Sequence, residues 1–142
     1  MAGKVNEYRK EQKMKRYIKS NIGLFGEDRD EFDDLADYYG YDSAAARAVD
    51  KAVESIGLDV WHDDGSIGGY INDPRDDSQY WVYVPYRTIS KLEDASSNKQ
   101  EFIQKVADEF LRRLDDPTNW EIEEWPDDLR LAVINGTPLS NL

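Results

Sequence analysis

This chain of 142 residues has one histidine and no cysteine, and its 30 acidic side chains offer too many carboxylate pairs for any one pair to indicate catalysis. A thiol nucleophile, a cysteine-ligated metal and a disulfide framework are therefore excluded. His62 is the single histidine, so a Ser-His-Asp triad would have to use it, yet no serine stands in a Gly-x-Ser-x-Gly setting. The sequence favours His62 as a polar residue at the end of a strand, and it predicts no catalytic residue.

Two further patterns could indicate a ligand site, and neither has the required spacing. Residues 65–69 read Gly-Ser-Ile-Gly-Gly, which matches neither phosphate-loop nor dinucleotide-binding spacing and precedes a predicted strand, so we expect a hairpin. The aspartates at 28–30 and 73–77 lack the glycine and the flanking helices of a calcium-binding EF-hand. The sequence therefore predicts no cofactor and no metal ion.

The charge of the chain is strongly acidic and unevenly distributed. The formal net charge is −12 and the sequence pI is about 4.4. Residues 1–20 carry seven basic and two acidic side chains, a net charge of +5, whereas the other 122 residues carry 11 basic and 28 acidic ones, a net charge of −17. An acidic body repels nucleic acid and anionic membranes and attracts basic protein surfaces. The alternative is that this charge only maintains solubility.

The acidic residues form three clusters, at residues 28–37, at 59–77 and at 115–128. On a helix, such side chains lie about 5–6 Å apart, close to the spacing of phosphates along a nucleic-acid strand. Aromatic residues such as Trp61, Trp81 and Trp120 are near these clusters, and aromatic rings beside charge are typical of protein interfaces. The predicted partner-binding acids are Asp30, Asp33, Asp34, Asp37, Asp63, Asp64, Asp76, Asp77, Glu121, Glu123 and Glu124.

Residues 1–20 are predicted to form a separate basic arm, helical over 4–19 because good helix formers dominate it. Its partner-binding residues are predicted to be Arg9, Lys10, Lys13 and Arg16. We expect the arm to contact an acidic patch, or bound nucleic acid, on the same target. Direct binding of nucleic acid is expected only through this arm.

Residues 21–142 are predicted to form a single acidic α+β domain. Apolar residues at 45, 48, 49, 52, 53 and 56 define a helix that Asp42 or Ser43 caps and Gly57 ends. Alternation and turn residues predict strands at 58–62, 67–72 and 79–86, with Pro85 at an edge or a strand end. The other predicted elements are a helix at 28–39, a helix from a Ser97–Gln100 capping box to Leu114, an extended piece at 120–125 and a helix at 129–134. The fold class is then a small α+β domain with about four to five helices packed on a three-stranded antiparallel meander.

The charge pattern favours a non-catalytic binding protein. A cytoplasmic location is expected, because neither a secretory signal nor a membrane span is evident in the sequence. The first hypothesis is a nucleic-acid mimic that blocks the basic groove of a nuclease or CRISPR effector, as anti-CRISPR and anti-restriction proteins of phages and mobile elements do. The second is an immunity protein that neutralises a basic toxin nuclease. The third is a winged-helix-like DNA-binding regulator, whose recognition helix would offer Arg47 and Lys51 against Asp50 and Glu54.

Overall fold

The computed structural model describes residues 22–40 and 43–142, so the helix predicted at 4–19 lies outside the described residues. The described ranges contain five α-helices and one three-stranded sheet, which confirms the predicted fold class. The helices are α2 (Leu35–Gly40), α3 (Ala44–Ser55), α4 (Tyr86–Asp94), α5 (Lys99–Leu114) and α6 (Asp127–Asn135). The strands are β1 (Asp59–His62), β2 (Ser66–Asn72) and β3 (Gln79–Pro85), and short 3-10 helices are η1 (Arg29–Glu31), η2 (Trp120–Ile122) and η3 (Leu139–Asn141).

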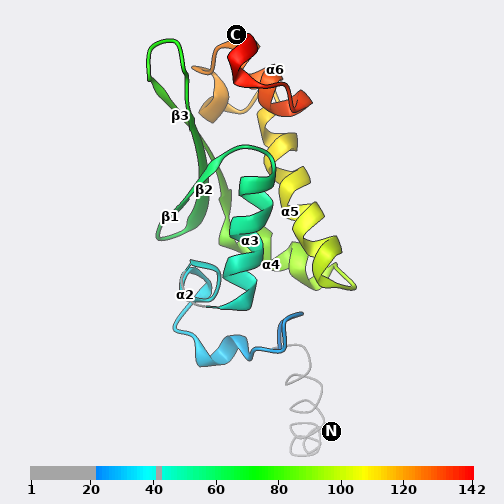
Figure 1. The fold of residues 1–142 in the computed structure, drawn as a ribbon. Coiled ribbons are helices and arrows are strands. Elements are labelled where there is room, and N and C mark those ends of the chain that lie inside the picture. Colours follow the sequence, from blue (N-terminus) through cyan, green and yellow to red (C-terminus); the bar gives the residue numbers. More distant parts are fainter. Residues whose placement is uncertain (1–21, 41–42) are drawn as a thin grey trace, which may run out of the picture.

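The sheet is an antiparallel meander in the order β1-β2-β3, and α3 and α5 lie on one side of it (Figure 1). The inner face of the sheet is closely packed at Gly69. A Cβ atom added there would lie 2.9 Å from Leu58 Cδ1 and 3.3 Å from a ring carbon of Phe110 in α5. The helices therefore fix which face of each strand is buried.

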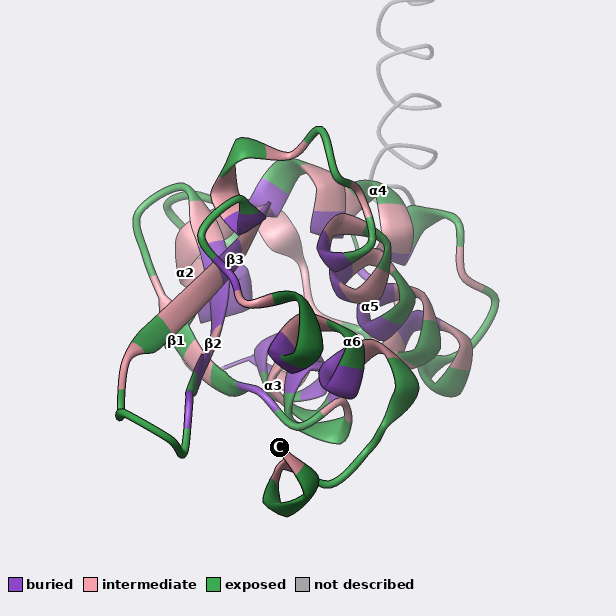
Figure 2. Ribbon diagram, turned by 90° about the horizontal axis from the view of Figure 1, so that it is seen from above, coloured by how far each residue is buried: buried purple, intermediate pink, exposed green. Residues whose placement is uncertain are grey.

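The hydrophobic core fills the space between the sheet and these two helices (Figure 2). Helix α3 buries Val49 and Val53 on the predicted face, and α5 buries Phe102, Val106 and Phe110. Ser43 begins α3, since its hydroxyl accepts a hydrogen bond from the Ala46 N–H at 2.9 Å. Gly57 follows α3 with a φ of +88°, a left-handed conformation that glycine adopts without strain.

The continuous helix predicted at 28–39 is wrong. The chain instead forms η1, passes through an extended Phe32 (φ −107°, ψ 148°) and then begins α2 at Leu35. Asp28 accepts a hydrogen bond from the Asp30 N–H, and Asp34 accepts one from the Asp37 N–H, each at 3.0 Å. Aspartate side chains that bind nearby N–H groups in this way start new turns and interrupt a helix.

The strand prediction at 79–86 needs a small correction, because β3 ends at Pro85 and Tyr86 begins α4. The Tyr86 N–H still donates a hydrogen bond to the Gly65 carbonyl at 3.1 Å. Tyr86 therefore continues the hydrogen bonding between β2 and β3 by one residue while it begins α4. Proline just before a helix fits this change, since it favours the extended conformation that Pro85 has (φ −62°, ψ 144°).

Two other local predictions also differ from the structure. The cap of α5 is Asn98, one residue later than predicted: its side chain accepts from the Glu101 N–H at 2.8 Å, while Glu101 accepts from the Ser97 N–H at 2.7 Å. The segment 120–125 is not extended but curls into η2. Asn119 starts this turn by accepting a hydrogen bond from the Glu121 N–H at 3.1 Å.

The turns of the meander point to opposite ends of the molecule (Figure 1). The β1–β2 turn lies at the lower end, beside α2 and residues 22–40, whereas the β2–β3 turn lies at the upper end, close to α6 and the C-terminus. In the described ranges, no helix has both the length and the apolar character that crossing a membrane requires.

Candidate functional site

The outer face of the sheet, turned away from α3 and α5, is formed by aromatic side chains. Tyr70 pairs with Trp81 across β2 and β3, and Trp61, Gly68 and Tyr83 form the neighbouring cross-strand row. The same strands place Ile67, Gly69 and Ile71 on the inner face, because successive side chains alternate. We call Trp61, Tyr70, Trp81 and Tyr83 the aromatic face.

The rings of the aromatic face pack against one another. The Tyr70 and Trp81 rings are 4.5 Å apart between centroids with an interplanar angle of 26°, and Trp81 and Tyr83 are 5.6 Å apart at 8°. Gly68 lies beneath them, and a Cβ atom there would lie 2.9 Å from a Tyr83 ring carbon and 3.2 Å from Trp81. Trp61 remains 56% exposed. The result is an ordered aromatic surface that none of the described α-helices covers.

The free edge of β3 is closed by side chains from α5 and from residues 121–125. The Glu121 carboxylate accepts a hydrogen bond from the Tyr83 N–H at 3.2 Å, and the Arg113 guanidinium donates to the Tyr83 carbonyl at 3.2 Å. The Trp125 indole donates to the Trp81 carbonyl at 3.0 Å. These contacts fix the position of η2 beside the aromatic face and occupy backbone groups that another strand would otherwise pair with.

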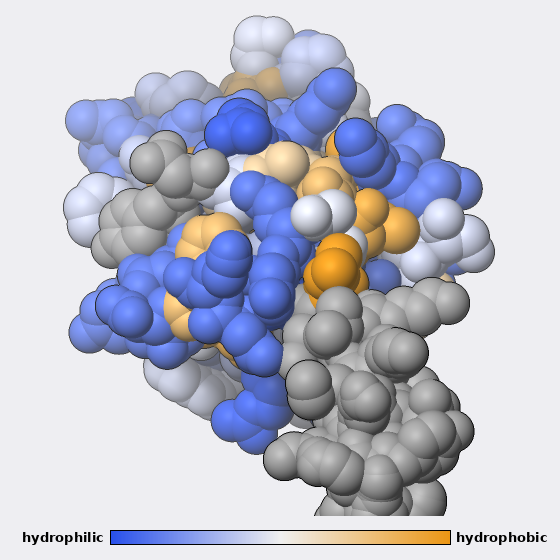
Figure 3. Space-filling view, turned by 90° about the horizontal axis from the view of Figure 1, so that it is seen from below, coloured by the Kyte–Doolittle hydropathy of each residue, from blue (hydrophilic) through white to orange (hydrophobic). Residues whose placement is uncertain are grey.

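The predicted acids at 30–37 and at 63–64 are brought together at the lower end. Asp34 and Asp64 line one surface hollow of about 300 Å³, together with Leu35 and Gly65. Seen from below, the described part of this end is largely hydrophilic, with hydrophobic residues visible between the hydrophilic ones (Figure 3). We define the lower acidic group as Asp30, Asp33, Asp34, Asp37, Asp63 and Asp64; all are exposed except the half-buried Asp37.

The other predicted acids lie at the upper end, so the middle cluster of the sequence is divided between the two ends. Arg75, in the β2–β3 turn, forms ion pairs with Asp73 at 2.8 Å and with Asp128 of α6 at 2.7 Å. This guanidinium lowers the pKa of both carboxyls. It also ties the turn to the start of α6. We define the upper acidic group as Asp76, Asp77, Glu121, Glu123 and Glu124, in which Glu121 is half-buried and the others are exposed.

Several of these acids also have structural roles. Asp76 accepts from the Ser78 N–H at 3.0 Å, and Asp77, which has a φ of +64°, accepts from the Asn72 side chain at 3.1 Å. Asp63 accepts from the Asp64 N–H at 2.9 Å. Substitution of these residues would therefore disturb turns as well as charge.

The aromatic face lies between the two acidic groups. Burial raises the pKa of Tyr83, and the nearby carboxylates of Asp63 and Glu121 raise it further. Asp63 belongs to the lower acidic group and Glu121 to the upper one, so both groups contribute to the raised pKa of Tyr83. The sequence grouped these aromatic residues with acids, but it could not show that they share one face.

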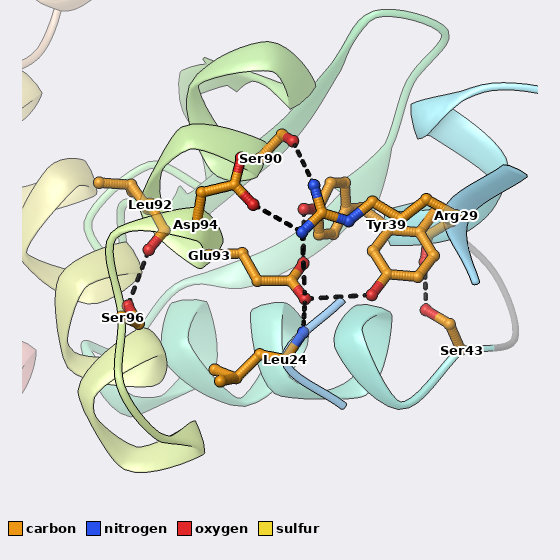
Figure 4. Close-up of polar contacts among 10 residues, drawn as sticks. Leu24, Arg29, Tyr39, Ser43, Ser90, Leu92, Glu93, Asp94 and Ser96 are labelled. Atoms are coloured by element: carbon orange, nitrogen blue, oxygen red, sulfur yellow. Dashed lines mark hydrogen bonds and ion pairs between the residues drawn. The ribbon is translucent and has the colours of Figure 1, made fainter. Parts of the chain in front are cut away.

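A buried carboxylate network holds the lower end together, and the sequence analysis missed it (Figure 4). Glu93 of α4 is only 2% exposed and accepts hydrogen bonds from the Tyr38 hydroxyl at 3.1 Å, the Tyr39 hydroxyl at 2.7 Å and the Leu24 N–H. The Arg29 guanidinium lies 3.8 Å away and pairs with Asp94 at 2.7 Å. The network anchors residues 22–40, which carry four of the six members of the lower acidic group.

The residues considered for catalysis or metal binding occupy ordinary structural positions. His62 Nε2 lies 2.9 Å from the Asp50 carboxylate of α3, and Gly65 and Ser66 form the predicted hairpin. Within residues 22–40 and 43–142, no three His, Asp or Glu side chains are arranged to hold a metal ion. Arg9, Lys10, Lys13 and Arg16 lie outside the described residues.

Comparison of the chain with protein-family models, with curated proteins and with solved structures finds no match.

Proposed function

We propose that this chain is a non-catalytic binding protein that occupies the basic, nucleic-acid-binding groove of a nucleic-acid-processing enzyme and inhibits it. The observation that carries the proposal is the position of the two acidic groups at opposite ends of one uncovered aromatic face. Carboxylates in place of phosphates attract a groove that evolved to bind nucleic acid, and exposed rings supply apolar contact. A nuclease or CRISPR effector is the class of target we propose.

The solvent-facing side of α3 gives less support to a winged-helix function. The helix buries six residues, and it exposes Arg47 and Lys51 together with Glu54. Binding to duplex DNA depends heavily on neutralising phosphates, which the adjacent acidic groups would oppose. Direct DNA binding therefore stays a prediction that a gel shift at low salt can test.

The proposal can be tested by affinity capture from a lysate of the organism that carries the gene, with elution at high salt. We expect to capture a basic nucleic-acid-binding enzyme. The purified chain should prevent this enzyme from binding its nucleic-acid substrate. A small basic toxin nuclease would instead establish the immunity alternative, because the charge logic of both functions is the same. Recovery of nucleic acid alone would contradict both.

Charge-reversal variants make the test specific to the surface. Asp33→Lys with Glu123→Lys places one reversal in each acidic group, at exposed side chains that form no turn contact described above. The matched control is Glu54→Lys with Asp108→Lys, which changes the net charge equally on the exposed sides of α3 and α5. We expect only the first pair to weaken capture strongly. Equal effects of the two pairs would mean that net charge, and not this surface, drives binding.

A further inference from the structure

The structure contains a hollow beside the aromatic face that differs from the rest of the acidic surface. It has a volume of about 270 Å³ and lies between β3 and η2. Trp81 and Tyr83 of β3 form one side, and Trp120 of η2 contributes to the other. Trp120 is 78% exposed, more than any other large hydrophobic side chain in the described part of the chain. Its indole is therefore available to a partner.

The charges at this hollow are negative, and one of its two carboxylates has no partner within the described part of the chain. The carboxylates of Glu121 and Glu124 both line it, and no lysine or arginine is among its lining residues. Glu121 is held by the Tyr83 N–H at 3.2 Å. Glu124 is exposed and makes no hydrogen bond or ion pair with any residue that the structure describes. The hollow thus combines aromatic walls with a free carboxylate.

We propose that this hollow receives an arginine side chain of the basic partner, with the guanidinium against the Trp120 and Trp81 rings and paired with Glu124. The inference rests on the proposed function, because it names the chemical group that the basic surface places here. A cation over an indole face is attracted by the ring electrons, and tryptophan is the best of the aromatic side chains for this contact. The guanidinium is planar, stacks on rings and can bind a carboxylate through two N–H groups.

The same features disfavour two other occupants. A lysine ammonium is a compact, strongly hydrated charge that neither stacks on a ring nor forms the paired contact with a carboxylate. A nucleic-acid base could stack on Trp120, but its phosphates would approach Glu121 and Glu124. Arginine therefore fits the combination of rings and carboxylates better than either.

The test uses the full chain, labelled with ¹⁵N, and short peptides of arginine or of lysine as probes. The indole N–H signals report on the hollow separately, because Trp81, Trp120 and Trp125 line it and Trp61 does not. We expect the arginine peptide to shift the Trp120 and Trp81 signals at several-fold lower concentration than the lysine peptide. The Trp61 signal should move little.

Matched variants separate this hollow from general attraction to an acidic protein. Trp120→Ala should weaken binding of the arginine peptide about fivefold, and Glu124→Gln should weaken it as well. The controls are Leu131→Ala, which removes an exposed apolar side chain outside the hollow and the aromatic face, and Glu54→Gln, which removes an exposed charge of α3 outside both acidic groups. Both controls should bind nearly as the unaltered chain does.

Equal binding of the two peptides, or equal effects of Trp120→Ala and Leu131→Ala, would overturn the arginine inference. Because Trp120 is largely exposed, its removal should leave the fold intact, and the remaining indole signals verify this.

The two proposals fail differently. If charge reversal abolishes capture of the partner while Trp120→Ala does not affect it, the hollow is not used and the proposed function stands. If neither change affects capture, both proposals are wrong.

Discussion

The buried carboxylate of Glu93 determines how residues 22–40 attach to the rest of the fold. Its two oxygens accept from two tyrosine hydroxyls and one backbone N–H. The same site leaves no room for a side chain at Gly23, where a Cβ atom would collide with Tyr38 and Glu93. The network thus requires Glu93 as the acceptor and Gly23, 70 positions earlier, as a residue without a side chain.

We predict that Glu93→Gln lowers the free energy of unfolding by about 2–3 kcal/mol, because it weakens charge-assisted hydrogen bonds and places an amide N–H₂ group among donors. Urea denaturation followed by tryptophan fluorescence measures the change. The control is Glu54→Gln on the exposed side of α3, which should change stability by less than about 0.5 kcal/mol. A similar small effect for Glu93→Gln would show that the network does not stabilise the fold.

The same network predicts how stability depends on alkaline pH. Burial raises the pKa of Tyr38 and of Tyr39 well above the ordinary value, and the Glu93 carboxylate raises both further. The unfolded chain therefore loses these protons first, at about pH 10, so the tyrosine contribution to stability should be constant below that pH and fall as the pH rises above it. Unfolding measured between about pH 8 and 11 tests this, and Tyr39→Phe should reduce the slope. A slope unchanged in that variant would contradict the assignment.

At the scale of elements, the sequence predicts the parts whose apolar spacing is regular. Val49 and Val53 define the buried side of α3, and Phe102, Val106 and Phe110 define that of α5, so both helices are where the pattern places them. The three strands and their antiparallel order follow from alternation between turn residues. These elements are long or strongly patterned, so local preference and packing agree.

The elements that were mispredicted depend on side-chain contacts that spacing does not reveal. Asp34 and Asn119 bind backbone N–H groups and start turns where a helix and an extended piece were expected. Helix α4 was not predicted. Glu93 within it is of a residue type that usually faces solvent, yet it is buried. Its burial is possible because tyrosines 54 and 55 positions away donate hydrogen bonds to it. The hollow beside Trp120 also depends on this kind of tertiary contact, since Glu121 and Trp125 hold η2 against β3.

The cap of α3 allows a prediction at this scale. The Ser43 hydroxyl accepts from the Ala46 N–H and also donates to the Tyr38 carbonyl, and the residue is fully buried. We predict that Ser43→Ala lowers the free energy of unfolding by about 1–2 kcal/mol. Asn98→Ala removes the exposed cap of α5 and should cost less, about 1 kcal/mol. Thermal or urea unfolding of both variants provides the comparison, and a larger loss for Asn98→Ala would contradict it.

At the scale of the whole molecule, the fold rearranges the charge pattern of the sequence. Three clusters along the chain become two groups in space, because the β1–β2 and β2–β3 turns carry their aspartates to opposite ends of the sheet. In the aromatic face between them, Gly68 leaves space for the rings of Trp81 and Tyr83, and Trp81 packs against Tyr70 and Tyr83. This arrangement gives a partner apolar contact at the centre and charge attraction at both ends, which is the basis of the proposed function.

The most direct test of that function is competition between this chain and nucleic acid for the captured enzyme, measured by fluorescence anisotropy of a labelled substrate at increasing salt. We predict that the chain displaces the substrate, that high salt weakens the displacement, and that Asp33→Lys with Glu123→Lys abolishes it while Glu54→Lys with Asp108→Lys does not. Simultaneous binding of chain and substrate to the enzyme, or displacement unaffected by reversal in both acidic groups, would contradict the account.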